Sequence, residues 1–226
     1  MRIAEQLFLL LTTDSGRAEP WATYRNYALS AGVLMDLAIA EAVTVTPGKR
    51  AKVVQGPLLL SAPSPAESDS LTRIGRKPGR RAQSWIANQR FARPRLIAAP
   101  LVDAGVLERR HRGFGFISWS NYPVRDASAE ARLRARLQQV VHGQTQETME
   151  EGIVLLFLHA IDAHRSVLKD EIKGAGYGTV GRTAKEIRYS LIAPELDRTP
   201  PHVADAVEGI HYALVSAVAA ARAASS

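Results

Sequence analysis

The sequence predicts a mainly α-helical protein, folded as a single compact helical domain over residues 1–226 with small β-hairpins. Apolar residues recur at helical spacing through several long stretches. The two stretches with strand character are short, and each contains glycine where a tight turn is needed. A chain of 226 residues that is 46% hydrophobic can also bury a sizeable core.

The N-terminal part of the chain should contain two helices and one hairpin. Residues 3–12 have helical character, and a polar turn follows them. Within 21–43 the apolar residues recur at i, i+4, i+5, i+8 and i+9, which is the stripe of an amphipathic helix. The next segment, VTVTPGKRAKVVQG, predicts a hairpin that turns at Pro47 and Gly48.

The middle of the chain should hold a loop and three helices. The composition of 61–70 predicts a surface loop. Short helices are expected at 71–77 and 81–91, separated by a Pro-Gly pair. RLIAAPLVDAGVL should then form a helix with a kink at Pro100.

A second hairpin is expected over 109–122, and helices should make up most of the remaining chain. Residues 128–142 show an amphipathic pattern. Thr148 and Glu151 have capping-box spacing before the apolar run IVLLFLHAI, so a helix should begin there. Two more helices are expected near 182–193 and 202–224.

The positive charge is concentrated in the middle third of the chain. The net charge is +7, and charge of this sign attracts nucleic acids, anionic lipids and phosphate ligands alike. The segment from Leu71 to Val102 contains eight basic residues and no acidic one. These like charges repel one another, so stability alone does not explain them and an anionic partner is favoured. The eight basic residues between Leu71 and Val102 are Arg73, Arg76, Lys77, Arg80, Arg81, Arg90, Arg93 and Arg95.

Composition also excludes several classes of site and location. The absence of cysteine excludes disulfides, thiolate zinc sites and a cysteine nucleophile. The apolar run Leu7–Leu11 is too short for a signal peptide. We expect no stretch to approach the ~20 apolar residues that a spanning helix needs. We therefore expect a cytoplasmic protein that is at most peripheral to a membrane.

The sequence contains no convincing catalytic or cofactor-binding motif. Gly176, Gly178 and Gly181 match GxGxxG, but the residues before them are polar and helical where a dinucleotide site needs a buried strand. His159 and His164 are five residues apart, and this spacing points them about 140° apart around a helix axis. The Ser, His and Asp residues are scattered, and their order in the sequence indicates no nucleophile–base pair. We expect no catalytic residue, no metal and no cofactor.

The stretch RRHRGFGFISW, residues 109–119, combines arginines with large apolar side chains. A nucleic acid, a bilayer surface or a basic turn leading into a core strand would each explain it. Together with the preceding helix it resembles a winged-helix DNA-binding regulator. That helix, however, offers only Arg95 and Asp103 to base edges and contains a proline, so nucleic acid is an unlikely partner.

Several blocks resemble the Golgi phosphoprotein 3 family in order and spacing. They are AEQLFLLLTTDSGR, the following Trp, LSAGVLMDLAIAEAV, LVDAGVLERR, a hairpin and NYP. The resemblance covers roughly residues 4–220 and suggests a divergent, bacterial-type member. It implies a mostly helical domain, a hairpin that enters a membrane, and a pocket for the headgroup of phosphatidylinositol 4-phosphate. It also implies client proteins and possible homo-oligomers, since eukaryotic members hold cytosolic tails of Golgi glycosyltransferases.

The resemblance assigns residues to these roles by position. The pocket tryptophan falls on Trp21, although a Trp at a helix start is equally consistent with a cap on the core. Three family arginines fall on Ser30, Phe91 and Pro94 here. We expect the headgroup pocket to be formed by Trp21, Arg25, Arg90 and Arg93, in which Arg90 and Arg93 keep the i, i+3 spacing and Arg25 replaces the charge missing at Ser30.

The resemblance also explains the basic and apolar hairpin. Its membrane-inserting residues would be Arg112, Phe114, Gly115, Phe116 and Ile117. A basic residue near an anionic surface contributes about 1 kcal/mol, and a fully buried large apolar side chain about 1.5–3 kcal/mol. Partial insertion should then yield roughly 5–8 kcal/mol, which is reversible, micromolar-to-millimolar binding. The expected function is a peripheral membrane adaptor that binds an anionic phospholipid membrane surface.

Overall fold

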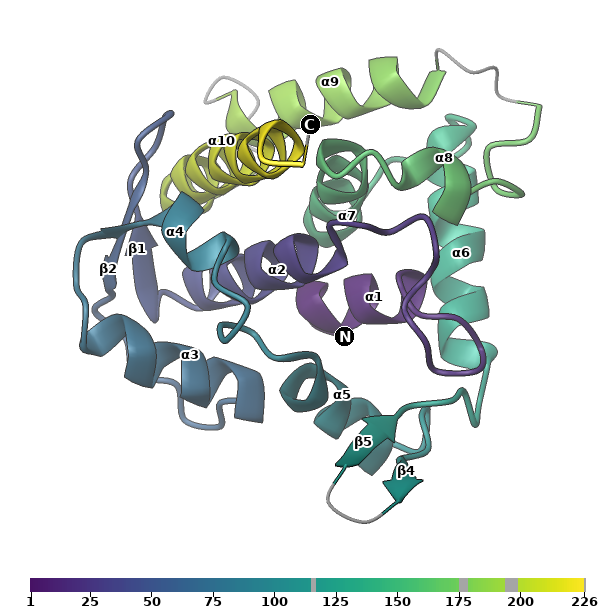
Figure 1. The fold of residues 1–226 in the computed structure, drawn as a ribbon. Helices are drawn as coiled ribbons and strands as arrows, with labels where there is room; N and C mark the ends of the chain where they lie inside the picture. The colour runs from purple at the N-terminus through teal and green to yellow at the C-terminus, as the bar shows by residue number, and fades with distance from the viewer. Residues whose placement is uncertain (115–116, 175–178, 194–198, 226) are drawn as a thin grey trace.

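The computed structural model describes the backbone of residues 1–114, 117–174, 179–193 and 199–225. Side chains are described over the same ranges except 112–114, 117–119 and 179–183. The described elements form a mainly helical fold, as the sequence predicts (Figure 1). The helices are α1 Ile3–Leu10, α2 Arg25–Ile39, α3 Pro65–Gly75, α4 Ala82–Ile86, α5 Pro94–Asp103, α6 Ser128–Val141, α7 Met149–Ala160, α8 His164–Val167, α9 Thr179–Ile192 and α10 Pro201–Ala223.

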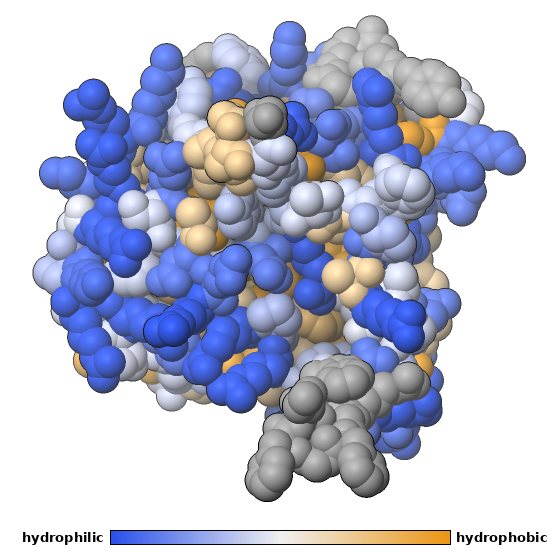
Figure 2. Space-filling view, viewed as in Figure 1, coloured by the Kyte–Doolittle hydropathy of each residue, from blue (hydrophilic) through white to orange (hydrophobic). Residues whose placement is uncertain are grey.

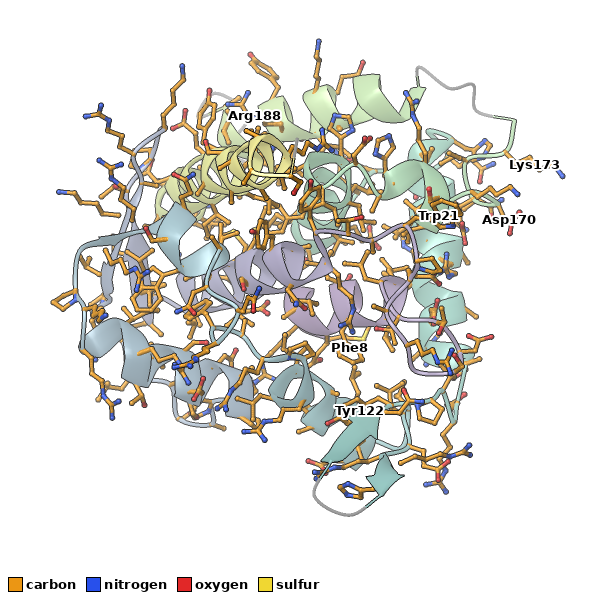
Figure 3. The ribbon with its side chains drawn as sticks, in the orientation of Figure 1. Phe8, Trp21, Tyr122, Asp170, Lys173 and Arg188 are labelled. Atoms are coloured by element: carbon orange, nitrogen blue, oxygen red, sulfur yellow. The ribbon has the colours of Figure 1, made fainter. Side chains whose placement is uncertain are left out.

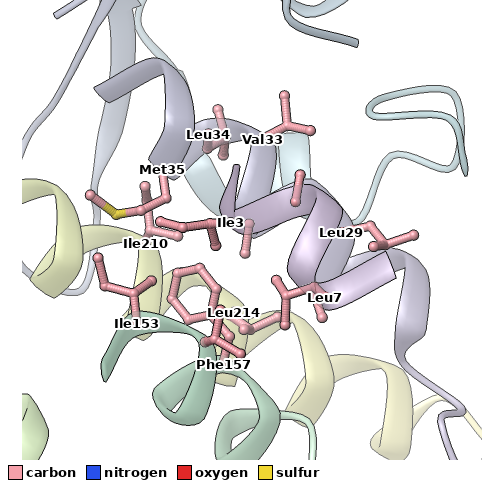
Figure 4. Packing of buried hydrophobic residues seen from close by; sticks show 14 of the residues in the cluster. Ile3, Leu7, Leu29, Val33, Leu34, Met35, Ile153, Phe157, Ile210 and Leu214 are labelled. Carbon is pink, nitrogen blue, oxygen red and sulfur yellow. The ribbon is translucent and has the colours of Figure 1, made fainter. Parts of the chain in front are cut away.

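The core is built around α1, whose eight residues are all buried. Helix α1 packs on α2, α5, α6 and α7. Apolar side chains of α1, α2, α7 and α10 gather in one cluster (Figure 4). Helix α1 begins against a carboxylate of α2. Asp36 Oδ1 accepts a hydrogen bond from the backbone N–H of Ile3 at 2.8 Å, and Asp36 Oδ2 accepts one from that of Ala4 at 3.0 Å. Two otherwise unpaired donors at the start of α1 are thereby satisfied.

The strands form two small antiparallel sheets. Strands β1 Val43–Val45 and β2 Lys52–Gln55 form the predicted first hairpin, and β3 Arg80–Arg81 extends it as an unpredicted third strand. The predicted second hairpin is confirmed in its described strands, β4 Arg110–Phe114 and β5 Ile117–Asn121. In Figure 1 this hairpin lies at the lower edge of the molecule, next to α5.

The predicted loop over 61–70 is wrong beyond its fourth residue, because α3 begins at Pro65. Ser64 caps the helix. Its Oγ accepts a hydrogen bond from the N–H of Glu67 at 3.3 Å, and the Glu67 carboxylate accepts one from the N–H of Ser64 at 2.6 Å. Proline at the first helical position has no N–H to satisfy. Capping chemistry therefore outweighs the loop-like composition of SAPSPAESDS.

Helix α10 corrects another expectation. Over Pro201–Ala223 it is long and apolar enough to cross a membrane, and it alone meets that test within the described residues. Half of its apolar window is buried inside the fold, where it contacts α2, α4 and α7. An apolar helix that packs on several others is typical of a protein core.

Candidate anion-binding site

Trp21 lies at the end of the loop that joins α1 to α2, and its side chain is 71% exposed. Figure 3 shows it on the side of the molecule that carries α6 and α8. This exposure excludes the alternative that Trp21 caps the core. A large exposed indole is available to contact a ligand or an interface.

Arg25, the first residue of α2, points back toward the end of α1. Its Nη2 donates a hydrogen bond to Thr12 Oγ1 at 2.7 Å, and its guanidinium carbon lies 4.7 Å from the centre of the Phe8 ring. Among the described residues no carboxylate pairs with it, and its Nε is buried without a partner. Burial lowers the pKa of Arg25 to about 10, so the side chain remains charged at neutral pH.

The start of α2 adds positive potential near this arginine. Tyr24 is the N-cap, and its side chain makes no capping hydrogen bond. The first turn of the helix contains no acidic residue. Backbone N–H groups at a helix start favour a negative charge nearby. Arg25 and the start of α2 therefore form a cationic site, and the exposed Trp21 precedes Arg25 by four residues in the sequence.

Arg93 has a different environment from Arg25. Its Nη2 lies 3.0 Å from Asp69 Oδ1, and Arg73 binds the same carboxylate at 2.7 Å. The ion pair joins the start of α5 to α3. Arg90 is exposed, and its backbone N–H donates to Asn88 Oδ1 at 3.0 Å. The surface over α3 is largely hydrophilic (Figure 2).

The predicted pocket residues thus fall into two groups. Trp21 and Arg25 are four residues apart, at the end of the α1–α2 loop and the start of α2, and Arg90 and Arg93 flank the α4–α5 connection. No hydrogen bond, ion pair or ring contact joins the two groups within the part of the chain that the structure describes. Two hollows lie beside Met1 and Glu150, and neither is lined by residues of these two groups.

The three positions that lack the family arginines have structural roles here. Ser30 is buried in α2. Phe91 is also buried and packs on Trp85, with ring centres 5.2 Å apart. Pro94 is the first residue of α5. A charged side chain at Ser30 or Phe91 would enter the core, where an unpaired charge is costly.

The tip of the hairpin, Gly115 and Phe116, lies outside the described residues, as do the side chains of Arg112, Phe114 and Ile117. The backbone of β4 and β5 places Phe114 opposite Ile117. These five residues remain predicted membrane contacts.

Sequence reasoning missed three residues that organise the site: Phe8, Thr12 and Tyr122. Thr12 binds Arg25 directly. The Phe8 ring lies between Arg25 and Tyr122, and it meets the Tyr122 ring edge-on with centres 6.2 Å apart (Figure 3). Tyr122 follows β5 directly, so the base of the hairpin contacts the aromatic floor of the Arg25 site. No local sequence motif predicts this arrangement, because it depends on tertiary packing.

The described fold is a helical domain with two small hairpins, and it holds Arg25 without a described acidic partner four residues after the exposed Trp21. Residues 3–221 match the family model of Golgi phosphoprotein 3 (GPP34), and the chain therefore belongs to this family. A comparison with curated proteins gives no match. The family match covers nearly the whole chain and confirms the resemblance drawn from the sequence.

Proposed function

We propose that this protein is a peripheral membrane adaptor that binds an anionic phospholipid headgroup at Trp21 and Arg25. By family resemblance the lipid is phosphatidylinositol 4-phosphate. The hairpin Arg112–Ile117 enters the bilayer beside the headgroup, client proteins bind to the membrane-bound adaptor, and no reaction is catalysed. The adaptor acts from the cytoplasmic side of the membrane.

The environment of Arg25 carries this proposal. Arg25 is partly buried, and a charge withdrawn from water is normally paired because its desolvation is costly. Arg25 has a hydroxyl and an aromatic ring as neighbours where a structural arginine would have a carboxylate. A phosphate would supply the missing negative charge. The site is thus better suited to a bound anion than to stabilising the apo fold.

Trp21 and the basic middle third of the chain support the same proposal. Trp is enriched at membrane interfaces, where its ring is partly desolvated and its N–H remains hydrogen-bonded. Exposed Arg90 adds long-range attraction to an anionic surface, worth about 1 kcal/mol. Arg93 would contribute less, since it would have to exchange the Asp69 carboxylate for a phosphate.

Vesicle flotation tests the proposal with three lipid mixtures: phosphatidylcholine alone, with phosphatidylserine, and with phosphatidylinositol 4-phosphate. Arg25→Gln removes the site's cation, and Arg50→Gln removes an equal charge from the exposed β1–β2 turn. A charge-assisted hydrogen bond contributes about 1.5–3 kcal/mol. Arg25→Gln should therefore weaken binding to anionic vesicles about tenfold or more, whereas Arg50→Gln should change it little.

Two results would count against the proposal. Equal losses for the two variants would mean that net charge alone draws the protein to vesicles. Failure of the wild-type protein to bind any anionic vesicle would end the lipid proposal. If duplex DNA then gave a mobility shift that weakens steeply with salt, the DNA-binding alternative would replace it.

A further inference from the structure

A polar turn in the α1–α2 loop is fastened to the base of the hairpin. Asn121, the last residue of β5, donates from Nδ2 to the backbone oxygen of Ser15 at 2.6 Å. Three residues further along the chain, the N–H of Val124 donates to the backbone oxygen of Asp14 at 3.0 Å. Asn121 itself is buried. Two segments more than a hundred residues apart in sequence are thus joined by two hydrogen bonds.

This contact is close enough to require glycine in the turn. A Cβ on Gly16 would lie 2.4 Å from Asn121 Oδ1 and 2.4 Å from the backbone carbon of Tyr122. Gly16 also has a φ of +81°, a conformation that other residues rarely adopt. A side chain at this position would therefore force the turn away from the hairpin base.

The other end of the same turn holds the Arg25 site. Thr12, which binds Arg25 Nη2, forms a β-bridge with Ala18 and closes the turn. Beneath it, the Phe8 ring contacts both Arg25 and Tyr122. The turn and the aromatic floor provide two separate connections between the hairpin and the cationic site.

We propose that Gly16 and Asn121 are positioning residues that hold the membrane-inserting hairpin and the headgroup site in one fixed relation. The inference rests on the proposed function. Two weak contacts that are held in the correct geometry bind one membrane with a high effective concentration, so each increases the affinity of the other. Release of the turn would leave each contact intact and remove that gain.

The experiment compares Gly16→Ala with Gly48→Ala. Gly48, in the β1–β2 turn, has a φ of +84°, and a Cβ there would meet nothing within 4 Å. The control therefore introduces similar backbone strain without a clash. Binding is measured to phosphatidylcholine vesicles containing phosphatidylinositol 4-phosphate and, by calorimetry, to soluble inositol 1,4-bisphosphate. Circular dichroism and thermal unfolding establish that each variant is folded.

We expect Gly16→Ala to bind these vesicles about tenfold more weakly than wild type while keeping wild-type affinity for the soluble bisphosphate. Gly48→Ala should match wild type in both assays. Arg25→Gln should lose both, which separates a headgroup contact from a positioning role. If Gly16→Ala does not fold, Asn121→Asp replaces it. That variant removes the Nδ2 donor to Ser15 and keeps the oxygen that accepts from the N–H of Tyr122.

The outcomes separate this inference from the proposed function. Vesicle binding by Gly16→Ala or Asn121→Asp equal to that of Gly48→Ala overturns the positioning role while leaving headgroup binding in place. If the variant also loses binding to soluble inositol 1,4-bisphosphate, the positioning role is overturned as well, because the turn would then only shape the headgroup site. If the wild-type protein binds neither the vesicles nor the bisphosphate, the proposed function itself is contradicted, and the positioning role with it.

Discussion

Arg25 donates a hydrogen bond to the Thr12 hydroxyl at 2.7 Å, and no described carboxylate neutralises it. Such a residue should contribute less to stability than its burial suggests. Arg25→Met keeps an unbranched side chain over Phe8 and removes a partly buried charge, so the free energy of unfolding should stay the same or rise by about 1 kcal/mol. Binding to anionic vesicles should fall. Urea unfolding and flotation measure the two effects.

Arg93→Met is the matched comparison. It removes one partner of the Arg93–Asp69 ion pair between α5 and α3. Because this pair is partly exposed, the loss should be about 1 kcal/mol or less, in the opposite direction from Arg25→Met. If Arg25→Met proves the more destabilising of the two, Arg25 is a structural residue and its assignment to a ligand site is wrong.

The capping of α1 by Asp36 gives a second prediction. Asp36→Asn leaves one of the two backbone N–H groups facing an amide donor. A buried donor without its acceptor costs about 1–3 kcal/mol. Chemical denaturation should show that loss, whereas Asp103→Asn, at an exposed position near the end of α5, should stay within about 0.5 kcal/mol of wild type. Equal effects from the two variants would contradict the capping role.

Asp36 should also make stability depend on pH. Burial raises its pKa from 3.8 to about 7, against the opposing effect of the hydrogen bonds from Ala4 and Ile3. The native protein then holds this proton more tightly than the unfolded chain does. Raising the pH from about 4 to about 7 should therefore lower this residue's contribution to the free energy of unfolding. The dependence should be absent from Asp36→Asn, which urea titrations across that range can establish.

Two histidines should give a pH dependence of the opposite sign. Burial lowers the pKa of His164 and of His211 from 6.5 to about 4. The His164 ring packs against that of His159, with centres 4.7 Å apart. The unfolded chain binds protons more tightly at these positions, so their contribution to stability should fall as the pH drops from about 6.5 to about 4. Thermal unfolding of His164→Gln should show a weaker dependence over that window, and an unchanged profile would mean that His164 does not protonate on unfolding.

Much of the fold could be predicted because its signals are local. Helical periodicity predicted α2 and α6, and the Thr148–Glu151 spacing predicted the start of α7. The same capping signal was present at Ser64 and Glu67, but the prediction gave more weight to the loop-like composition, whereas in the structure the capped helix forms. Strand β3 has only two residues, too few for any period to show.

The candidate site was only partly predictable. Trp21 and Arg25 lie close together in the sequence; family resemblance indicated Trp21, and Arg25 was expected only as a substitute for the charge missing at Ser30. The partners of Arg25 depend on packing between α1 and α2, and the Asn121–Ser15 contact joins segments 106 residues apart. Nothing in the sequence showed that Arg93 would bind Asp69, because that contact depends on how α3 meets α5.

The most direct test of the central claim is the affinity of the wild-type and Arg25→Gln proteins for phosphatidylcholine vesicles that contain phosphatidylinositol 4-phosphate, measured side by side. A phosphate bound at Trp21 and Arg25 predicts clear wild-type binding that weakens about tenfold or more when this one cation is removed. Equal affinities for the two proteins would show that the headgroup does not bind at Arg25.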